Sequence, residues 1–249
     1  AAPTSLAAHR AVYDITLVES AEETDITDVS GRLVMEFTGS ACTGYTSKLR
    51  FVTRMADPDG GQMVTDARSE TFESPDGQSL DFANETYAGD FLAEQSEGSA
   101  SRQPDHITVK LTKPEEKALE IRGPMVFPTD QIQRILTSAA RGEAFLSMAV
   151  YDGSEEGETV FETAGVIGPV STESGDVGEE TAIAEAGLAA MRHWPLTLSY
   201  FDRSESGDGT PFYVLSFVIY ENGIGRNLRI DYGDFALAGK LTGLELLPS

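Results

Sequence analysis

Apolar side chains take every second position through most of this 249-residue chain, the pattern of β-strands that bury one face. The clearest case is residues 31–55, where Leu33, Met35 and Phe37 precede a Gly-Ser-Ala-Cys-Thr-Gly bend and a second alternating run follows it. This segment predicts a β-hairpin with Cys42, the single cysteine, at its bend.

Turn signals separate further alternating runs along the chain. Pro-then-Gly turns occupy residues 57–61 and 74–77, and Asn222-Gly223 forms the sharpest hairpin signal. The Gly-, Ser- and Glu-rich residues 95–104 predict the longest loop of the first half. Altogether we expect about a dozen strands, more than an open twisted sheet usually carries before it curls or closes. The fold class is therefore mainly β, a long, highly curved antiparallel sheet.

One segment has helical rather than strand periodicity. After Pro128, apolar residues that include Ile132, Ile135 and Leu136 recur at helical spacing, and Arg141-Gly142 is typical of a helix end. Thr129 or Asp130 is the predicted cap at the start of the helix. Because one apolar stripe needs a partner surface, we expect this amphipathic helix to pack inside the curved sheet.

The best internal boundary is an acidic insertion at about residues 171–190. It combines a Gly- and Ser-containing stretch with an Ala-rich helix candidate over residues 181–191. Because all-β domains routinely reach this length, we expect one β-spiral domain over residues 1–249.

Charge and hydropathy exclude two classes of protein. The chain has 18 Lys and Arg against 41 Asp and Glu, a net charge of −23, so its average field repels nucleic-acid phosphates and anionic headgroups. No apolar run approaches the ~18 residues of a membrane helix. Ala1-Ala2-Pro3 is typical of the start left by signal peptidase, so we expect an exported protein whose signal peptide has been removed.

Catalytic and metal-binding signatures are weak. The histidines, His9, His106 and His193, have no metal-ligand spacing and predict ordinary surface or edge positions, and the aspartates near Gly60 favour a plain turn over a calcium loop. There is no G-x-S-x-G motif. Cys42 as a nucleophile would need nearby cations such as those at positions 48, 50 and 54, and a structural thiol or disulfide half-site is favoured. We expect no catalytic residue, metal or cofactor.

Several apolar residues at element boundaries or on the helix stripe are candidates for ligand binding. The competing interpretation is that they staple loops to the core. The candidates are Met125, Phe127, Ile132, Ile135 and Trp194.

Four sequence blocks carry a family resemblance. They are His9 to Asp14, the block from Gly31 to Met55, Phe127-Pro128-Thr129, and Asp231 to Phe235. As a set they resemble the EipB-like family of periplasmic cell-envelope integrity proteins of alphaproteobacteria. The resemblance implies a periplasmic β-spiral with a helix set into it, a role in envelope maintenance, and no enzymatic activity. It also implies pairing of Cys42 with a second cysteine near the C-terminus, although residues 246–249 contain none.

The leading hypothesis is a non-enzymatic protein that supports envelope integrity by binding an envelope protein, a lipid-like ligand, or both, as a monomer or weak dimer. The second is a lipid or lipoprotein carrier, because the implied shape is similar to carriers of the LolA and LolB type; it requires a continuous apolar cavity. The third, from another class, is a hydrolase or thiol enzyme that uses Cys42 or a carboxylate pair.

Overall fold

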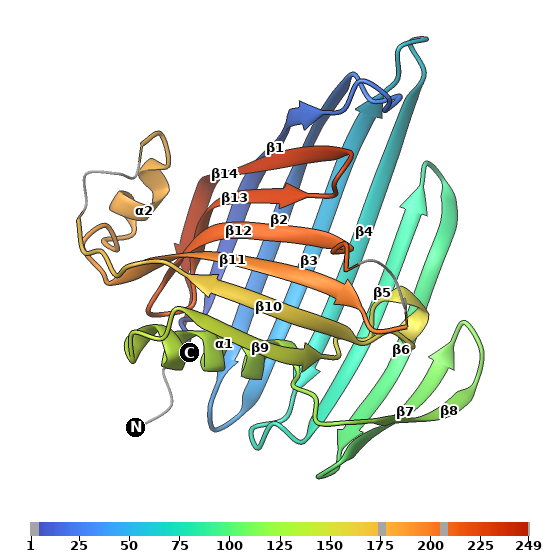
Figure 1. Cartoon of the computed structure of the whole chain (residues 1–249), viewed down its shortest axis with the longest axis vertical. Coiled ribbons are helices and arrows are strands. Elements are labelled where there is room, and N and C mark those ends of the chain that lie inside the picture. Colours follow the sequence, from blue (N-terminus) through green and yellow to red (C-terminus); the bar gives the residue numbers. More distant parts are fainter. Residues whose placement is uncertain (1–4, 174–177, 205–208, 249) are drawn as a thin grey trace.

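Fourteen antiparallel strands form one sheet in a computed structural model that describes residues 5–173, 178–204 and 209–248 (Figure 1). The strands are β1 (His9–Ser20), β2 (Asp28–Ser40), β3 (Gly44–Ala56), β4 (Gln62–Glu73), β5 (Ser79–Ala88), β6 (Phe91–Arg102), β7 (His106–Lys113), β8 (Lys117–Arg122), β9 (Phe145–Val150), β10 (Phe161–Ile167), β11 (His193–Asp202), β12 (Tyr213–Tyr220), β13 (Gly225–Asp231) and β14 (Phe235–Leu246). The helices are α1 (Pro128–Ala140), α2 (Thr181–Glu185) and the short 3-10 turn η1 (Glu155–Gly157).

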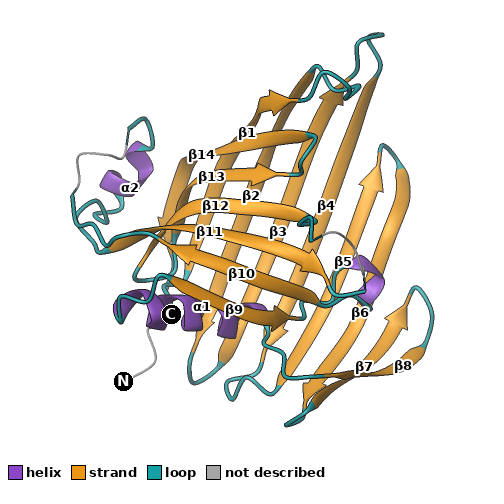
Figure 2. Ribbon diagram, viewed as in Figure 1, coloured by secondary structure: helices purple, strands orange, loops and turns teal. Residues whose placement is uncertain are grey.

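The first and last strands of the chain join the two halves of this sheet. β1 pairs with both β2 and β14, from His9 opposite Leu246 to Ser20 opposite Phe235. The edges are β8 and β9, which are neighbours in sequence and are connected through α1. Figure 2 shows the result, a curled sheet in which β9 to β13 cross in front of β1 to β4. The predicted class, a long curved antiparallel sheet with one amphipathic helix packed in it, is confirmed.

Helix α1 connects the two halves because its apolar stripe is buried against both. Ile135 and Leu136 belong to a core cluster that contains Phe37 of β2 and Trp194 of β11. Burial of such side chains contributes roughly 1.5–3 kcal/mol each. The helix is therefore fixed in the concave interior.

The predicted cap of α1 is wrong. Phe127 is the N-cap and provides no side-chain hydrogen bond, and Pro128 occupies the first turn. The Thr129 N–H donates instead to Oε1 of Glu73, at the end of β4, over 2.6 Å. A buried carboxylate distant in sequence therefore satisfies a backbone donor that local sequence was expected to satisfy.

Residues 95–104 do not form the predicted loop, because most of them belong to strand β6. The small residues that suggested a loop are needed for close packing. A Cβ atom on Gly98 would lie 2.4 Å from the Lys110 carbonyl oxygen, and Ser96 donates to the Gly153 carbonyl oxygen over 2.6 Å.

The acidic insertion is less helical than predicted, since α2 spans only Thr181–Glu185. Residues 174–177 of this segment lie outside the described residues. Ile183 and Leu188 are buried with Tyr13 and Leu241 in a second core cluster, so the described part covers the β1–β14 region of the sheet. Within the described residues, no helix has both the length and the apolar character needed to cross a bilayer.

Candidate functional site

A pocket of about 330 Å³ opens between the N-terminal end of α1 and the concave face of β2 to β5. Strand alternation places Met35 and Phe37 on this face, and Leu49 joins them because it is the cross-strand partner of Met35. Leu6 and Ile132 complete the apolar wall from the N-terminal segment and from α1. The volume falls within the range of ordinary small-molecule sites.

The opposite wall of this interior pocket is polar and acidic. Glu73 and Asp152 line it together with hydroxyl and amide side chains of β3 to β5. Burial raises the pKa of Glu73, against the hydrogen bonds from Thr129 that lower it. His9 also lines the pocket; burial lowers its pKa, and its Nε2 has no hydrogen-bond partner. This combination suits a ligand with an apolar body and hydrogen-bond donors better than an anion.

The five predicted ligand-binding residues are divided between the pocket and the core. Ile132 lines the pocket and is partly buried. Ile135 and Trp194 lie in the same core cluster behind it, at 1% and 3% exposure. Met125 and Phe127 are buried in a separate cluster with residues of β5 to β7 and β9. Ligand contact by these residues stays a prediction, and the structure gives only Ile132 a place on the pocket wall.

The pocket residues that sequence reasoning missed include Met35, Phe37, Leu49 and Glu73. The alternation already assigned the first three to one buried face. What the pattern could not indicate is that the sheet curls away from this part of the face and leaves it open. Glu73 gave no signal, because it ends a strand directly before a turn.

Cys42 is a free, exposed thiol in the turn between β2 and β3. Its backbone N–H donates to Oγ of Ser40 over 3.3 Å. The cations considered for its activation are engaged elsewhere: Lys48 with Glu70, Arg50 with Asp66, and Arg54 with Ser30. The setting required of a nucleophilic thiolate is therefore not provided by these three residues.

The turn that carries Cys42 lies at the same end of the sheet as the end of β14. The Leu247 N–H donates to the Ala8 carbonyl oxygen over 2.8 Å, and the next residue of β1, His9, pairs with Phe37 on β2. At this end of the sheet, only β1 lies between β2 and β14. The disulfide implied by the family resemblance stays a prediction.

Among the described residues, no group of three or more His, Cys, Asp or Glu is arranged to hold a metal ion. The predicted surface or edge placement is wrong for His9 and His193, which are 2% and 5% exposed. Nδ1 of His9 lies within hydrogen-bond distance of the Ala7 carbonyl oxygen, and Nδ1 of His193 lies within that distance of the Met191 carbonyl oxygen. Both are buried histidines at the first residue of a strand, β1 and β11 respectively.

Known proteins are similar to this chain over nearly its whole length. A family model described as EipB-like matches residues 1–248. The chain is 39% identical over 241 residues to the cell envelope integrity protein EipB of Brucella abortus (strain 2308), covering 97% of this chain and 84% of that protein. A solved Brucella abortus structure, described as a beta-barrel-like protein of a domain of unknown function, is 37% identical, with a TM-score of 0.89 over 98% of this chain and 99% of that chain. These matches confirm the resemblance carried by the sequence blocks: the chain belongs to the EipB-like family.

Proposed function

We propose that this chain is a non-enzymatic periplasmic protein that supports cell-envelope integrity by binding an apolar part of an envelope component in the interior pocket. The observation that carries the proposal is the apolar wall of that pocket, where Met35, Leu49 and Ile132 are left partly exposed inside the curled sheet. The role in envelope integrity is inferred from the relative that bears that name.

The chemistry of the pocket favours an apolar segment of an envelope protein over a free fatty acid. Glu73 and Asp152 would repel a carboxylate, whereas backbone N–H groups of a bound segment would find acceptors on the same wall. Leu6 and Phe37 of the pocket wall belong to one core cluster, and two further clusters fill other parts of the sheet interior. A carrier of lipids or lipoproteins, the second hypothesis, would use this same pocket, and recovery of a lipid would support it.

The test compares two tryptophan substitutions that differ in the face they occupy. Met35→Trp fills the interior pocket, while Val52→Trp adds the same bulk to the outer face of β3. Native mass spectrometry and pull-down from a periplasmic extract are expected to recover a bound envelope protein with the wild type and with Val52→Trp. Met35→Trp is expected to lose about tenfold or more of it.

Cells that carry each variant in place of the wild-type gene supply the functional readout, as sensitivity to detergent. Met35→Trp should sensitise the cells, and Val52→Trp should not. Equal recovery of the partner by all three proteins, or recovery of neither protein nor lipid, would contradict the proposal. Circular dichroism and thermal melting establish that both variants fold.

A further inference from the structure

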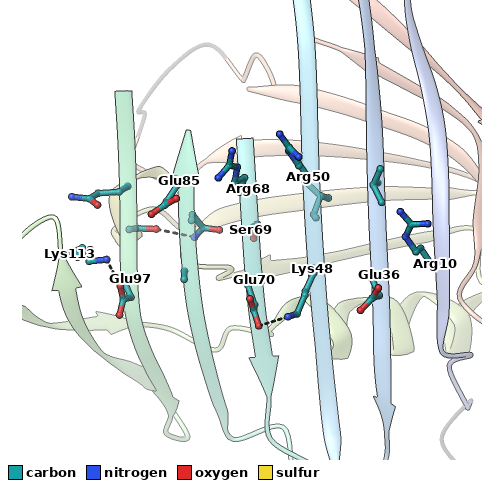
Figure 3. A pocket seen from close by; sticks show the side chains of 16 residues that line it. Arg10, Glu36, Lys48, Arg50, Arg68, Ser69, Glu70, Glu85, Glu97 and Lys113 are labelled. Atoms are coloured by element: carbon teal, nitrogen blue, oxygen red, sulfur yellow. Dashed lines mark hydrogen bonds and ion pairs between the residues drawn. The ribbon is translucent and has the colours of Figure 1, made fainter. Parts of the chain in front are cut away.

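A second hollow, of about 400 Å³, lies on the outer face of the sheet, across β1 to β7 (Figure 3). Its charged side chains come from the strand positions that alternate with those facing α1. Leu49, Ser69 and Asn84 line both this hollow and the interior pocket, which lie on opposite faces of the same strands. Five cations and four carboxylates line it, namely Arg10, Lys48, Arg50, Arg68, Lys113, Glu36, Glu70, Glu85 and Glu97. Asp66, which contacts two of these arginines, balances the fifth cation, so the charges of the trough cancel in a chain whose net charge is −23.

Two arginines lie side by side on adjacent strands of this outer trough (Figure 3). Arg50 of β3 and Arg68 of β4 are cross-strand partners, a like-charge pairing that is normally destabilising. Both guanidinium groups bind one carboxylate, that of Asp66, which is the next residue of β4 on the same face as Arg68. Arg50 reaches it through Nε at 3.0 Å and Nη2 at 2.9 Å, and Arg68 through Nε at 3.1 Å and Nη2 at 2.6 Å.

This arrangement leaves donors and charge uncommitted. Two guanidinium groups share one carboxylate, so the trio keeps one positive charge, and neither Nη1 is used in binding Asp66. The Arg68 guanidinium also lies 5.1 Å from the ring centre of Tyr87. Hydrogen bonds from Arg50 and Arg68 lower the pKa of Asp66 to about 2, so the trio stays intact at neutral pH. Both forks are held in place before any ligand arrives.

We propose that the Arg50–Arg68 pair binds the phosphate group of a small soluble molecule in the outer trough. Asp66 occupies the Nε and Nη2 edge of each guanidinium group, and the Nη1 and Nη2 edge that remains matches two oxygens of a phosphate. Two such groups held side by side supply both orientation and charge. Glu36, Glu70 and Glu97 lie in the neighbouring cross-strand row, where Glu70 pairs with Lys48 and Glu97 with Lys113. Their remaining lone pairs would accept hydrogen bonds from hydroxyl or ammonium groups of the same molecule. The ligand class is a phosphate ester that also carries such donors.

The charge distribution favours a free phosphate ester over the surface of an anionic bilayer. A small anion meets the local positive charge of the arginine pair, whereas a bilayer would also approach the surrounding surface of a strongly acidic protein. The glutamates at the rim of the trough add to that repulsion. None of the charged residues of the trough lines the interior pocket, so either proposal can fail alone.

The experiment titrates the full chain at low ionic strength with inorganic phosphate and with glycerol phosphate, by calorimetry. Arg50→Gln and Arg68→Gln each remove one fork. The matched control is Arg32→Gln, which removes an exposed arginine that lies on the same face and pairs with Asp14. Saturable binding by the wild type is expected to weaken about tenfold or more in each test variant and to change little in Arg32→Gln.

A charge-preserving variant and a membrane arm complete the test. Arg50→Lys keeps the charge and loses the fork, so it should also weaken binding, even if a glutamine variant fails to fold. Failure of phosphate to saturate, or equal weakening by Arg32→Gln, would overturn the proposal. The proposal would also be overturned if the protein did not bind glycerol phosphate but sedimented with phosphatidylglycerol vesicles and not with phosphatidylcholine vesicles.

Discussion

Replacing Glu180 with alanine is expected to destabilise the protein strongly, because this side chain is a buried junction between the acidic insertion and the sheet. It lies immediately before α2, with 6% exposure. Its Oε1 accepts hydrogen bonds from the backbone N–H groups of Asn227, over 2.9 Å, and Leu241, over 2.8 Å. Its Oε2 lies 3.6 Å from Nη1 of Arg226, which is also buried.

The expected magnitude follows from what alanine leaves behind. Two backbone donors on β13 and β14 lose their acceptor, at roughly 1–3 kcal/mol each for an unsatisfied buried group. Arg226 keeps the hydrogen bond from its Nε to the Tyr220 hydroxyl and its contact with the Tyr220 ring, but loses the carboxylate that balances its buried charge. Breaking a buried ion pair costs about 3–5 kcal/mol, and this loss overlaps with the first. We therefore expect the free energy of unfolding to fall by about 3–5 kcal/mol.

Urea unfolding measures this change, and the neighbouring residue supplies the control. Glu179 is exposed and pairs with Lys240 at the surface, so Glu179→Ala should leave the urea midpoint unchanged. Glu180→Gln keeps an acceptor for the backbone but loses the charge, so its effect should lie between those of the two alanine variants. Tryptic cleavage at Arg192, beyond α2, should accelerate in Glu180→Ala if the insertion loosens.

Two results would refute the reasoning. One is a Glu180→Ala protein as stable as the wild type, which would mean that water satisfies the backbone donors and Arg226. The other is an equal loss in Glu179→Ala, which would mean that net charge rather than burial matters. Adding Arg226→Met to Glu180→Ala removes the unpaired charge and is expected to restore part of the stability.

Three further predictions concern single positions. Burial raises the pKa of Glu73 in the folded protein above its ordinary value of 4.5. The wild type should therefore gain stability relative to Glu73→Gln as the pH falls from neutral through that raised pKa toward 4.5. Urea unfolding at several pH values measures this difference in stability, and a difference that does not change with pH would contradict the prediction. Gly98→Ala should lower the free energy of unfolding by about 1–3 kcal/mol, because the added Cβ would lie 2.4 Å from a backbone oxygen. Gly243→Ala should be nearly neutral, because its Cβ would lie 3.5 Å from the nearest atom. Equal effects of the two substitutions in thermal or urea unfolding would disprove the steric account. Cys42 should react with a maleimide in the folded protein about as fast as after denaturation, and marked protection would show that the thiol is covered.

Much of the secondary structure follows from local pattern. The hairpin around Cys42, the helix after Pro128 and the final strands all agree with the sequence, because alternation and helical spacing depend on which face each residue must bury. Residues 95–104 misled the prediction, since Gly and Ser in β6 serve close packing rather than a turn. The local sequence cannot distinguish these two uses of small residues.

The functional surfaces were less accessible to prediction. The Arg50, Asp66 and Arg68 trio could have been found from the register of one hairpin, because its turn at residues 57–61 fixes which residues lie opposite each other. The interior pocket could not, because its wall combines Leu6, Phe37 and Ile132 from distant segments. Their proximity depends on how the sheet curls around α1.

The sequence by itself determined most of the strands, the amphipathic helix, the main turns and the family, because each depends on residues a few positions apart or on short blocks read together. Only the tertiary structure decided that β1 joins β14, that Glu73 binds the first turn of α1, and that one face of the sheet stays open as a pocket. The physical reason is that these features depend on pairing and burial between segments far apart in the chain. The free energy of such contacts depends on the curvature of the whole sheet and on how its interior is filled, and no local pattern encodes either quantity.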